Sequence, residues 1–194
     1  HHEVLFPLIP SGASDSEALD TVFEALVHAG REVPLVKLLL VPDAWSNKIE
    51  MPEAHRALFA YCNCVMEPWD GPAALAVTDG RWILAGMDRA GLRPMRYTVT
   101  ADGLLLVGSE TGMVPVDETT VVEKGRLGPG EMVAVDFEAG RLYHDRELKD
   151  WLADSQPYGK WIENITELGS LIRADGPSPE PFPVAELRRR ERLF

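Results

Sequence analysis

The chain has 194 residues, the size of one ordinary globular domain. Its net charge of −12 at pH 7 argues against binding along a nucleic-acid backbone, where cationic side chains must replace counterions. No apolar run approaches the roughly 20 residues that cross a bilayer, and the sequence does not open with a charged segment followed by an apolar one. We therefore expect a soluble protein that binds neither nucleic acid nor membrane.

Helical patterns occupy the first third of the chain. Ser14 and Glu17 match the S-x-x-E capping box, in which the first turn of a helix satisfies its own polar groups. Apolar residues then recur at steps of three and four: Leu19, Val22, Phe23, Leu26 and Val27. Gly30 is expected to end this helix. We expect two further helical segments, a short one over residues 35–41 and a longer one that begins at Pro52.

After Pro68 the pattern changes to short apolar runs separated by turns that contain glycine, which is typical of antiparallel hairpins. The expected strand pairs are residues 72–78 with 82–88, 95–100 with 104–109, and 132–137 with 141–144. The first pair is apolar at consecutive positions, so we expect both faces of these two strands to be covered. Together the patterns predict an α+β domain, mainly antiparallel, with helices on one face of the sheets.

The end of the chain has a different composition. Helical or irregular segments are expected over residues 145–153 and 161–173. Prolines then alternate with other residues at Pro177, Pro179, Pro181 and Pro183, a pattern that cannot pack regularly. We therefore predict a domain over residues 1–174 and a linker over residues 175–194 that leads to the next domain. Its arginines are interpreted as part of a solvated helix, with nucleic-acid binding as the alternative.

Cys62 and Cys64 are the only cysteines, too few and too close together for the disulfide framework of a small secreted domain. On a helix, a spacing of two residues places them about 200° apart around the axis, so they cannot readily clamp one metal ion. We interpret them as packing residues in a reducing, cytoplasmic setting, with metal or redox chemistry as the alternative. The five histidines form no i, i+4 pair, and no metal site is expected.

Asp15 is the leading candidate for ligand binding. Two interpretations are open. A carboxylate in the first turn of a helix is favoured by the positive end of the helix dipole without any further role. The same carboxylate can also form a salt bridge with the ammonium group of a ligand, if a pocket lies above that turn.

Other polar residues are expected to be structural. Asp88, Arg89 and Arg93 are predicted to shape a corner between strands, with charges that satisfy one another. Glu110 follows a strand, and we expect its side chain to accept a structural hydrogen bond. Residues 125–130 are rich in glycine but lack the strand-to-helix context of a phosphate-binding loop, so they are interpreted as a turn before the next strand.

A succession of longer motifs is similar to one known family. The segments are S-D-S-E at residues 14–17, M-E-P-W-D-G-P-A-A-L-A-V-T-D-G at 66–80, M-D-R-A-G-L-R-P-M-R-Y at 87–97, G-S-E-T-G at 108–112 and E-K-G-R-L-G-P-G-E-M at 123–132. Over roughly residues 3–172 the chain resembles the later, carboxy-terminal part of a type 2 glutamine amidotransferase domain. The domains that it resembles are those of glutamate synthase large (alpha) subunits, which are Ntn hydrolases.

The resemblance implies a four-layer αββα sandwich, of which this chain supplies the later half. It implies an amino-terminal cysteine that attacks the side-chain amide of glutamine, giving glutamate and ammonia. In the full oxidoreductase the ammonia passes to 2-oxoglutarate. Within this family the carboxylate that matches Asp15 holds the α-amino group of glutamine, so the resemblance implies a substrate-binding role for Asp15.

The catalytic residues of this family are not found before Asp15. They are the cysteine with its free α-amino group, the arginine that takes the substrate carboxylate, and the Asn-Gly oxyanion pair. Cys62 and Cys64 cannot replace the nucleophile, because they lie inside the chain and lack the terminal amine that acts as base. We therefore expect no catalytic residue in this sequence and no glutamine hydrolysis by the chain alone.

The resemblance also implies cofactors and partners outside this segment. They are FMN and an iron–sulfur cluster in the full large subunit, and FAD with NADPH in a small partner subunit; no cofactor is expected here. Apolar strand faces left open to water predict self-association of the chain. Two alternatives are kept: another type 2 amidotransferase, such as an amidophosphoribosyltransferase, and a noncatalytic binding or assembly module of the same fold.

Overall fold

The structure is a computed structural model that describes residues 7–45, 50–166 and 168–171. The chain divides into two units, His1–Glu163 and Asn164–Phe194. The second unit contains one short helix among its described residues, α6 (Leu168–Leu171). The expected linker and its arginines lie outside the described residues, so the boundary at residue 174 stays a prediction.

The first unit contains five α-helices among its described residues. They are α1 (Asp15–His28), α2 (Val33–Leu40), α3 (Glu53–Val65), α4 (Asp145–Ser155) and α5 (Tyr158–Ile162). The three helices expected in the first third of the chain are confirmed. Gly30, with φ of 89°, follows the end of α1, a conformation that costs glycine little. Within the described ranges, no helix has the length and apolar character needed to cross a membrane.

Within the residues that the structure describes, seven strands form two antiparallel sheets. The four-stranded sheet has the order β1-β2-β6-β7, and the three-stranded sheet has the order β4-β3-β5. The strands are β1 (Ala74–Thr78), β2 (Trp82–Met87), β3 (Arg96–Thr100), β4 (Leu105–Gly108), β5 (Val121–Arg126), β6 (Met132–Asp136) and β7 (Arg141–Tyr143). The three expected hairpins, β1–β2, β3–β4 and β6–β7, are all present.

β5 is a strand that the sequence pattern did not predict. The interpretation of residues 125–130 as a turn is wrong for Gly125 and Arg126, which end this strand and pair with β3. The reason is local packing. The ring of Tyr97 fills the space where a side chain at Gly125 would lie. The strand therefore has glycine at this position and lacks the apolar residue that would have marked it as a strand. The turn itself lies between the end of β5 and the start of β6.

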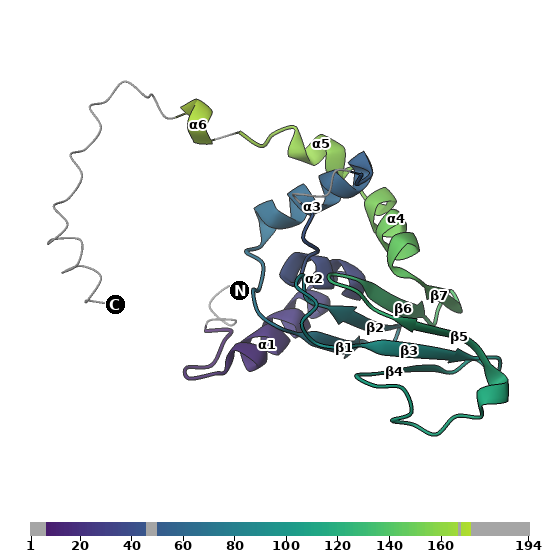
Figure 1. Ribbon diagram of the computed structural model, residues 1–194. Coiled ribbons are helices and arrows are strands. Elements are labelled where there is room, and N and C mark those ends of the chain that lie inside the picture. Colours follow the sequence, from purple (N-terminus) through teal and green to yellow (C-terminus); the bar gives the residue numbers. More distant parts are fainter. Residues whose placement is uncertain (1–6, 46–49, 167, 172–194) are drawn as a thin grey trace, which may run out of the picture. The chain divides into compact units, whose positions relative to one another are not determined.

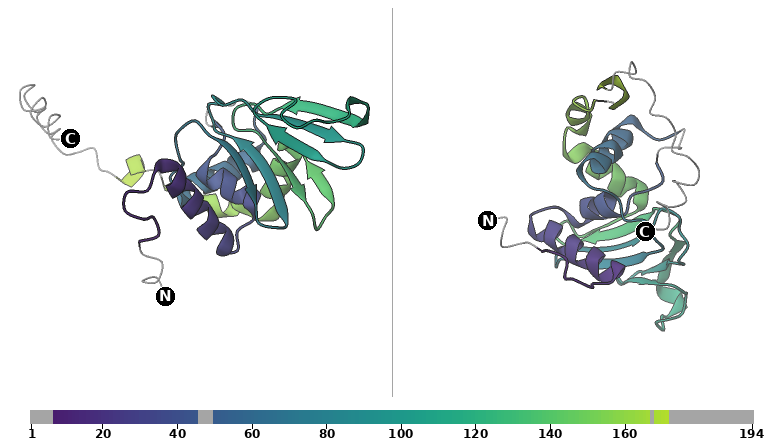
Figure 2. Two further views of the ribbon diagram at one scale, coloured as in Figure 1. Left: turned by 90° about the horizontal axis from the view of Figure 1, so that it is seen from below. Right: turned by 90° about the vertical axis from the view of Figure 1, so that its left-hand side faces the viewer.

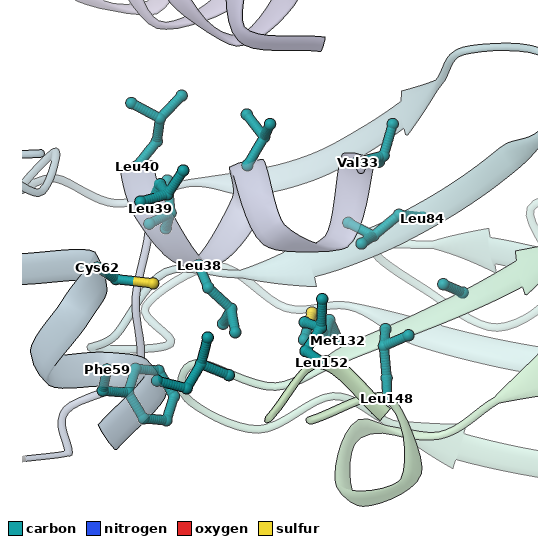
Figure 3. Close-up of a cluster of buried hydrophobic side chains, with 14 of the residues drawn as sticks. Val33, Leu38, Leu39, Leu40, Phe59, Cys62, Leu84, Met132, Leu148 and Leu152 are labelled. Carbon is teal, nitrogen blue, oxygen red and sulfur yellow. The ribbon is translucent and has the colours of Figure 1, made fainter. Parts of the chain in front are cut away.

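The layers follow the alternation of side chains along β2 and β6. Trp82, Leu84, Met132 and Ala134 belong to the larger apolar core, which the helices complete. Figure 3 shows side chains from α2, α3, α4, β2 and β6 converging in this core. The intervening residues, including Met87 and Val133, form a second apolar cluster with residues of the three-stranded sheet. The described residues of the first unit therefore form three layers, helices, sheet and sheet, and confirm the α+β class (Figures 1 and 2).

Coverage of the first hairpin differs from the expectation. β1 lies at the edge of the four-stranded sheet, and its residues alternate between exposed and half-buried. The expectation that both faces of β1 are covered is therefore wrong. It holds for most of β2, where only Ile83 is exposed. The consecutive small apolar residues of β1 did not distinguish an edge strand from a central one.

The three-stranded sheet is an insertion between two neighbouring strands of the other sheet. β2 and β6 pair directly, yet β3, β4 and β5 all lie between them in the sequence. The inserted segment leaves the four-stranded sheet after β2 and returns to it before β6. There, Met87 N donates to Glu131 O over 2.9 Å and Leu127 N donates to Met95 O over 3.0 Å. These backbone bonds tie the two crossing segments together.

Candidate functional site

The start of α1 has the local structure that the sequence predicted. Ser14 is the N-cap residue, and its Oγ accepts a hydrogen bond from Glu17 N over 3.3 Å. In return, a carboxylate oxygen of Glu17 accepts from Ser14 N over 3.4 Å. The capping box is thus complete, and it orients the first turn without using the side chain of Asp15.

Asp15 is the first residue of α1 and is exposed. Within the described part of the chain, its carboxylate forms no hydrogen bond or ion pair. A groove of about 750 Å³ runs between α1 and β1, and its helical wall begins one turn later, at Leu19 and Asp20. The carboxylate of Asp15 therefore lies at the positive end of the helix, in the turn before the residues that line this groove, and is not itself a lining residue.

The corner after β2 is built around Asp88, which is buried. One carboxylate oxygen accepts from Ala73 N over 3.1 Å, and the other accepts from Ala90 N and Gly91 N over 2.9 and 3.0 Å. The backbone thus satisfies Asp88, and the expectation that it pairs with the neighbouring arginines is wrong. A buried carboxylate with three N–H donors fixes a turn, as the structural interpretation required.

The remaining candidates of this region are dispersed on the surface. Arg89 forms an exposed ion pair of 2.7 Å with Asp70. Arg93 is exposed, and no ion pair joins it to a described residue. Glu110 is also exposed and lines a cavity of about 210 Å³ on the three-stranded sheet. Its carboxylate accepts no hydrogen bond within the described ranges, contrary to expectation. The structure does not bring these residues together with Asp15.

The two cysteines face different environments on α3. Cys62 is buried in the larger core, and burial raises the pKa of its thiol to about 12. Cys64 is exposed, and both thiols are free. Because only the thiolate is a good nucleophile, the buried thiol is poorly suited to covalent catalysis. The described residues contain no cluster of three or more side chains suited to holding a metal ion.

A polar cluster joins the two sheets and was not predicted. Glu123 Oε1 accepts a hydrogen bond from the hydroxyl of Tyr97 over 2.7 Å and lies 2.7 Å from His144 Nε2. The hydrogen bond from Tyr97, followed by that from His144, holds the pKa of Glu123 below its usual range. Burial, followed by the hydrogen bond to Glu123, raises the pKa of Tyr97 to about 12. The one sequence signal for this cluster was Glu123 itself, a charged residue in β5, which the sequence pattern did not predict as a strand.

A second unpredicted feature is a pair of buried lysines. Lys37 lies within the apolar run of α2, and Lys149 lies on α4. Lys149 Nζ is 2.7 Å from a carboxylate oxygen of Asp145 and 3.3 Å from one of Asp43. The sequence signal for these buried lysines was the single lysine in V-P-L-V-K-L-L-L, because a charged residue is rare in an otherwise apolar helix.

Comparison with known proteins identifies the family. The model of the class-II glutamine amidotransferases matches residues 1–161 of the chain. The chain belongs to this family. The α+β architecture with antiparallel sheets and flanking helices is consistent with the Ntn-hydrolase fold that was expected for such amidotransferases.

The relatives of the chain include glutamate synthases, of which it matches only a small part. The chain is 59% identical, over its whole length, to 13% of the glutamate synthase [NADPH] large chain of Azospirillum brasilense. It is 40% identical, over 98% of its length, to 12% of the corresponding chain of Bacillus subtilis. A ferredoxin-dependent glutamate synthase of Arabidopsis thaliana is 44% identical over 84% of the chain. The chain thus spans about an eighth of the first two relatives.

Proposed function

We propose that this chain is part of a glutamate synthase large subunit and contributes to the hydrolysis of glutamine to glutamate and ammonia. The observation that carries this proposal is the 59% identity over the full chain to a protein of that name. The relatives reported above are glutamate synthases, and this does not favour the alternative of an amidophosphoribosyltransferase-like enzyme. In the complete enzyme the ammonia passes to 2-oxoglutarate.

In this proposal Asp15 binds the α-ammonium group of glutamine. Its exposed carboxylate is supported by a complete capping box and makes no competing hydrogen bond within the described residues. A substrate ammonium therefore meets a carboxylate whose backbone position is already fixed. Fixing the charged head of glutamine holds its amide within reach of a nucleophile, which is how orientation lowers a reaction barrier.

The nucleophile and the oxyanion donors are proposed to come from residues outside this chain. Cys62 is buried with a raised pKa, and neither Cys62 nor Cys64 carries a terminal amine that could act as base. The contribution of these 194 residues is then substrate binding and the scaffold of two sheets. The same proposal predicts that the isolated chain does not hydrolyse glutamine.

The proposed setting is cytoplasmic, with redox cofactors carried elsewhere. FMN and an iron–sulfur cluster belong to other domains of the large subunit. A small subunit that contains FAD supplies electrons from NADPH. Two free cysteines, one of them exposed, are compatible with a reducing compartment. Self-association of the isolated chain is proposed from its exposed apolar side chains, among them Leu104 and Val122.

The decisive experiment replaces Asp15 by Asn in the intact polypeptide that contains this chain. Glutamate formation is measured with glutamine and, separately, with added ammonia. Loss of a charged hydrogen bond costs about 1.5–3 kcal/mol, so the KM for glutamine should rise roughly 10- to 150-fold. Activity with ammonia should stay unchanged, because ammonia bypasses the glutamine site.

The matched control is Asp154→Asn, at an exposed aspartate of α4 that does not line the groove between α1 and β1. It makes the same chemical change away from Asp15 and should leave the KM for glutamine unaltered. An unchanged KM in Asp15→Asn would remove Asp15 from the substrate site. Absence of any glutamine-dependent activity in the wild-type polypeptide would instead favour a noncatalytic binding or assembly module.

A further inference from the structure

Lys37 is the only charged residue of α2, and it is completely buried. Its ammonium nitrogen donates a hydrogen bond to the carbonyl of Gly130 over 2.9 Å. The strand beneath accommodates the lysine stem, because a Cβ atom at Gly86 would lie only 2.9 Å from Lys37 Cε. The lysine therefore connects the helical layer to the turn that rejoins the four-stranded sheet.

The charged groups around Lys37 come from three other segments. Lys149 and Asp145 lie on α4, Asp43 follows α2, and Asp88 follows β2. Asp145 and Asp43 contact Lys149, and the carboxylate of Asp88 accepts from backbone amides. Within the described part of the chain, no carboxylate lies within ion-pair distance of the Lys37 amine. The amine thus has a carbonyl partner but no direct counter-ion.

This arrangement favours the uncharged amine. Burial, followed by repulsion from Lys149, lowers the pKa of Lys37 to about 7, against the opposing attraction of Asp145, Asp43 and Asp88. A neutral amine still has N–H groups and can keep its hydrogen bond to Gly130. Protonation makes the hydrogen bond to Gly130 a charge-assisted one, but it also places an ammonium charge in a fully buried position. Desolvation of that charge is the largest cause of the lowered pKa, so protonation disfavours the closed junction.

We propose that the contact between Lys37 and Gly130 is a pH-sensitive junction between α2 and the turn that joins β5 to β6. The junction is closed when the Lys37 amine is neutral and opens when the amine is protonated. This junction goes beyond the proposed glutamine chemistry and does not depend on it. It is positioned to act on the turn, because Gly130 N also donates to Asp88 O over 2.8 Å. Opening the turn exposes the amine and breaks this backbone bond.

The direction of the pH effect follows from proton binding. In the opened state Lys37 has its ordinary pKa of 10.5, whereas in the closed state the pKa is about 7. Between these values the opened state binds a proton that the closed state does not bind. Opening is therefore favoured as pH falls through this window, and closure is favoured as pH rises.

Hydrogen exchange of residues 128–132, followed by mass spectrometry in the intact polypeptide, tests the junction. After correction for the intrinsic pH dependence of exchange, the opening constant should fall on the order of 20-fold between pH 6.5 and 8.5. Lys37→Met keeps most of the side-chain volume and should abolish this dependence. Lys124→Met, at an exposed lysine of β5, should retain it.

A flat wild-type profile, or the same pH dependence in Lys37→Met, would overturn the proposal. If Lys37→Met does not fold, the wild-type profile still decides. A dependence confined to residues 128–132 and absent from residues 96–100 of β3 supports the junction. A dependence of equal size in both segments contradicts it, because it reports opening of the domain as a whole.

Discussion

The indole of Trp82 donates a hydrogen bond from Nε1 to a carboxylate oxygen of Glu32 over 2.7 Å. Trp82 is wholly buried at the start of β2, and Glu32 precedes α2 as its N-cap residue. The neighbouring Arg81 reaches Glu32 over 3.1 Å and Asp136 over 2.9 Å. Two adjacent side chains at one end of β2 thus join the start of α2 to β6.

Trp82→Phe should destabilise the domain by about 1–3 kcal/mol, since it removes a hydrogen bond to a charged acceptor and leaves space in the core. Chemical denaturation followed by circular dichroism measures the free energy of unfolding. The control is Trp161→Phe, at a tryptophan that is 43% exposed, which should cost clearly less. Equal costs at the two positions would show that the Glu32 contact contributes nothing.

Asp136 should make the domain sensitive to acid. Hydrogen bonds from Arg81 hold the pKa of this buried carboxyl below its ordinary value, although burial acts in the opposite direction. A lowered pKa contributes stability above the unfolded value of about 3.9, and this contribution is lost as pH falls through the folded value. Asp136→Asn should flatten the fall of unfolding free energy below pH 5, whereas Glu67→Asn at an exposed position should not.

The sequence predicted the elements whose local signals agree with their packing. α1 has both a capping box and an apolar stripe, and the hairpins have glycine at turns such as Gly80. β5 was missed because its pattern is charged and its packing depends on Tyr97, which lies more than 20 residues away. The sequence also did not distinguish the edge strand β1 from the central strand β2, because strand pairing depends on contacts throughout the fold.

Gly125→Ala tests the packing that defines β5. The added carbon would collide with the ring of Tyr97, so the ring must move and its hydrogen bond to Glu123 is disturbed. We expect a loss of about 1–3 kcal/mol in the free energy of unfolding. Gly159→Ala is the matched control, because open space surrounds that helical glycine and alanine favours a helix. A neutral effect at Gly125 would contradict the close contact.

The two thiols should differ strongly in reactivity. Cys64 is exposed, whereas Cys62 is buried and has its pKa raised to about 12. An aromatic disulfide reagent at pH 8 should therefore modify one thiol per native chain quickly and the second only after denaturation. Cys64→Ser should abolish the fast reaction, and Cys62→Ser should leave it intact. Fast modification of both thiols would show that α3 opens readily.

The candidate site was predictable only in part. The position of Asp15 at the start of a capped helix follows from four consecutive residues, so local sequence was sufficient. The buried lysines were not found, because Lys37 and Gly130 are brought together by long-range packing. The corner at Asp88 was correctly located, but its backbone partner Ala73 belongs to the neighbouring segment and could not be read from the motif.

The insertion of β3, β4 and β5 between β2 and β6 has a consequence for how the polypeptide reaches its native state. The β2–β6 ladder closes a loop that contains residues 88–131, whereas the β1–β2 and β3–β4 hairpins close within a few residues. Closing a longer loop costs more chain entropy, and folds rich in distant pairings assemble slowly. The hairpins should consequently form first, and closure of the central ladder should limit the folding rate.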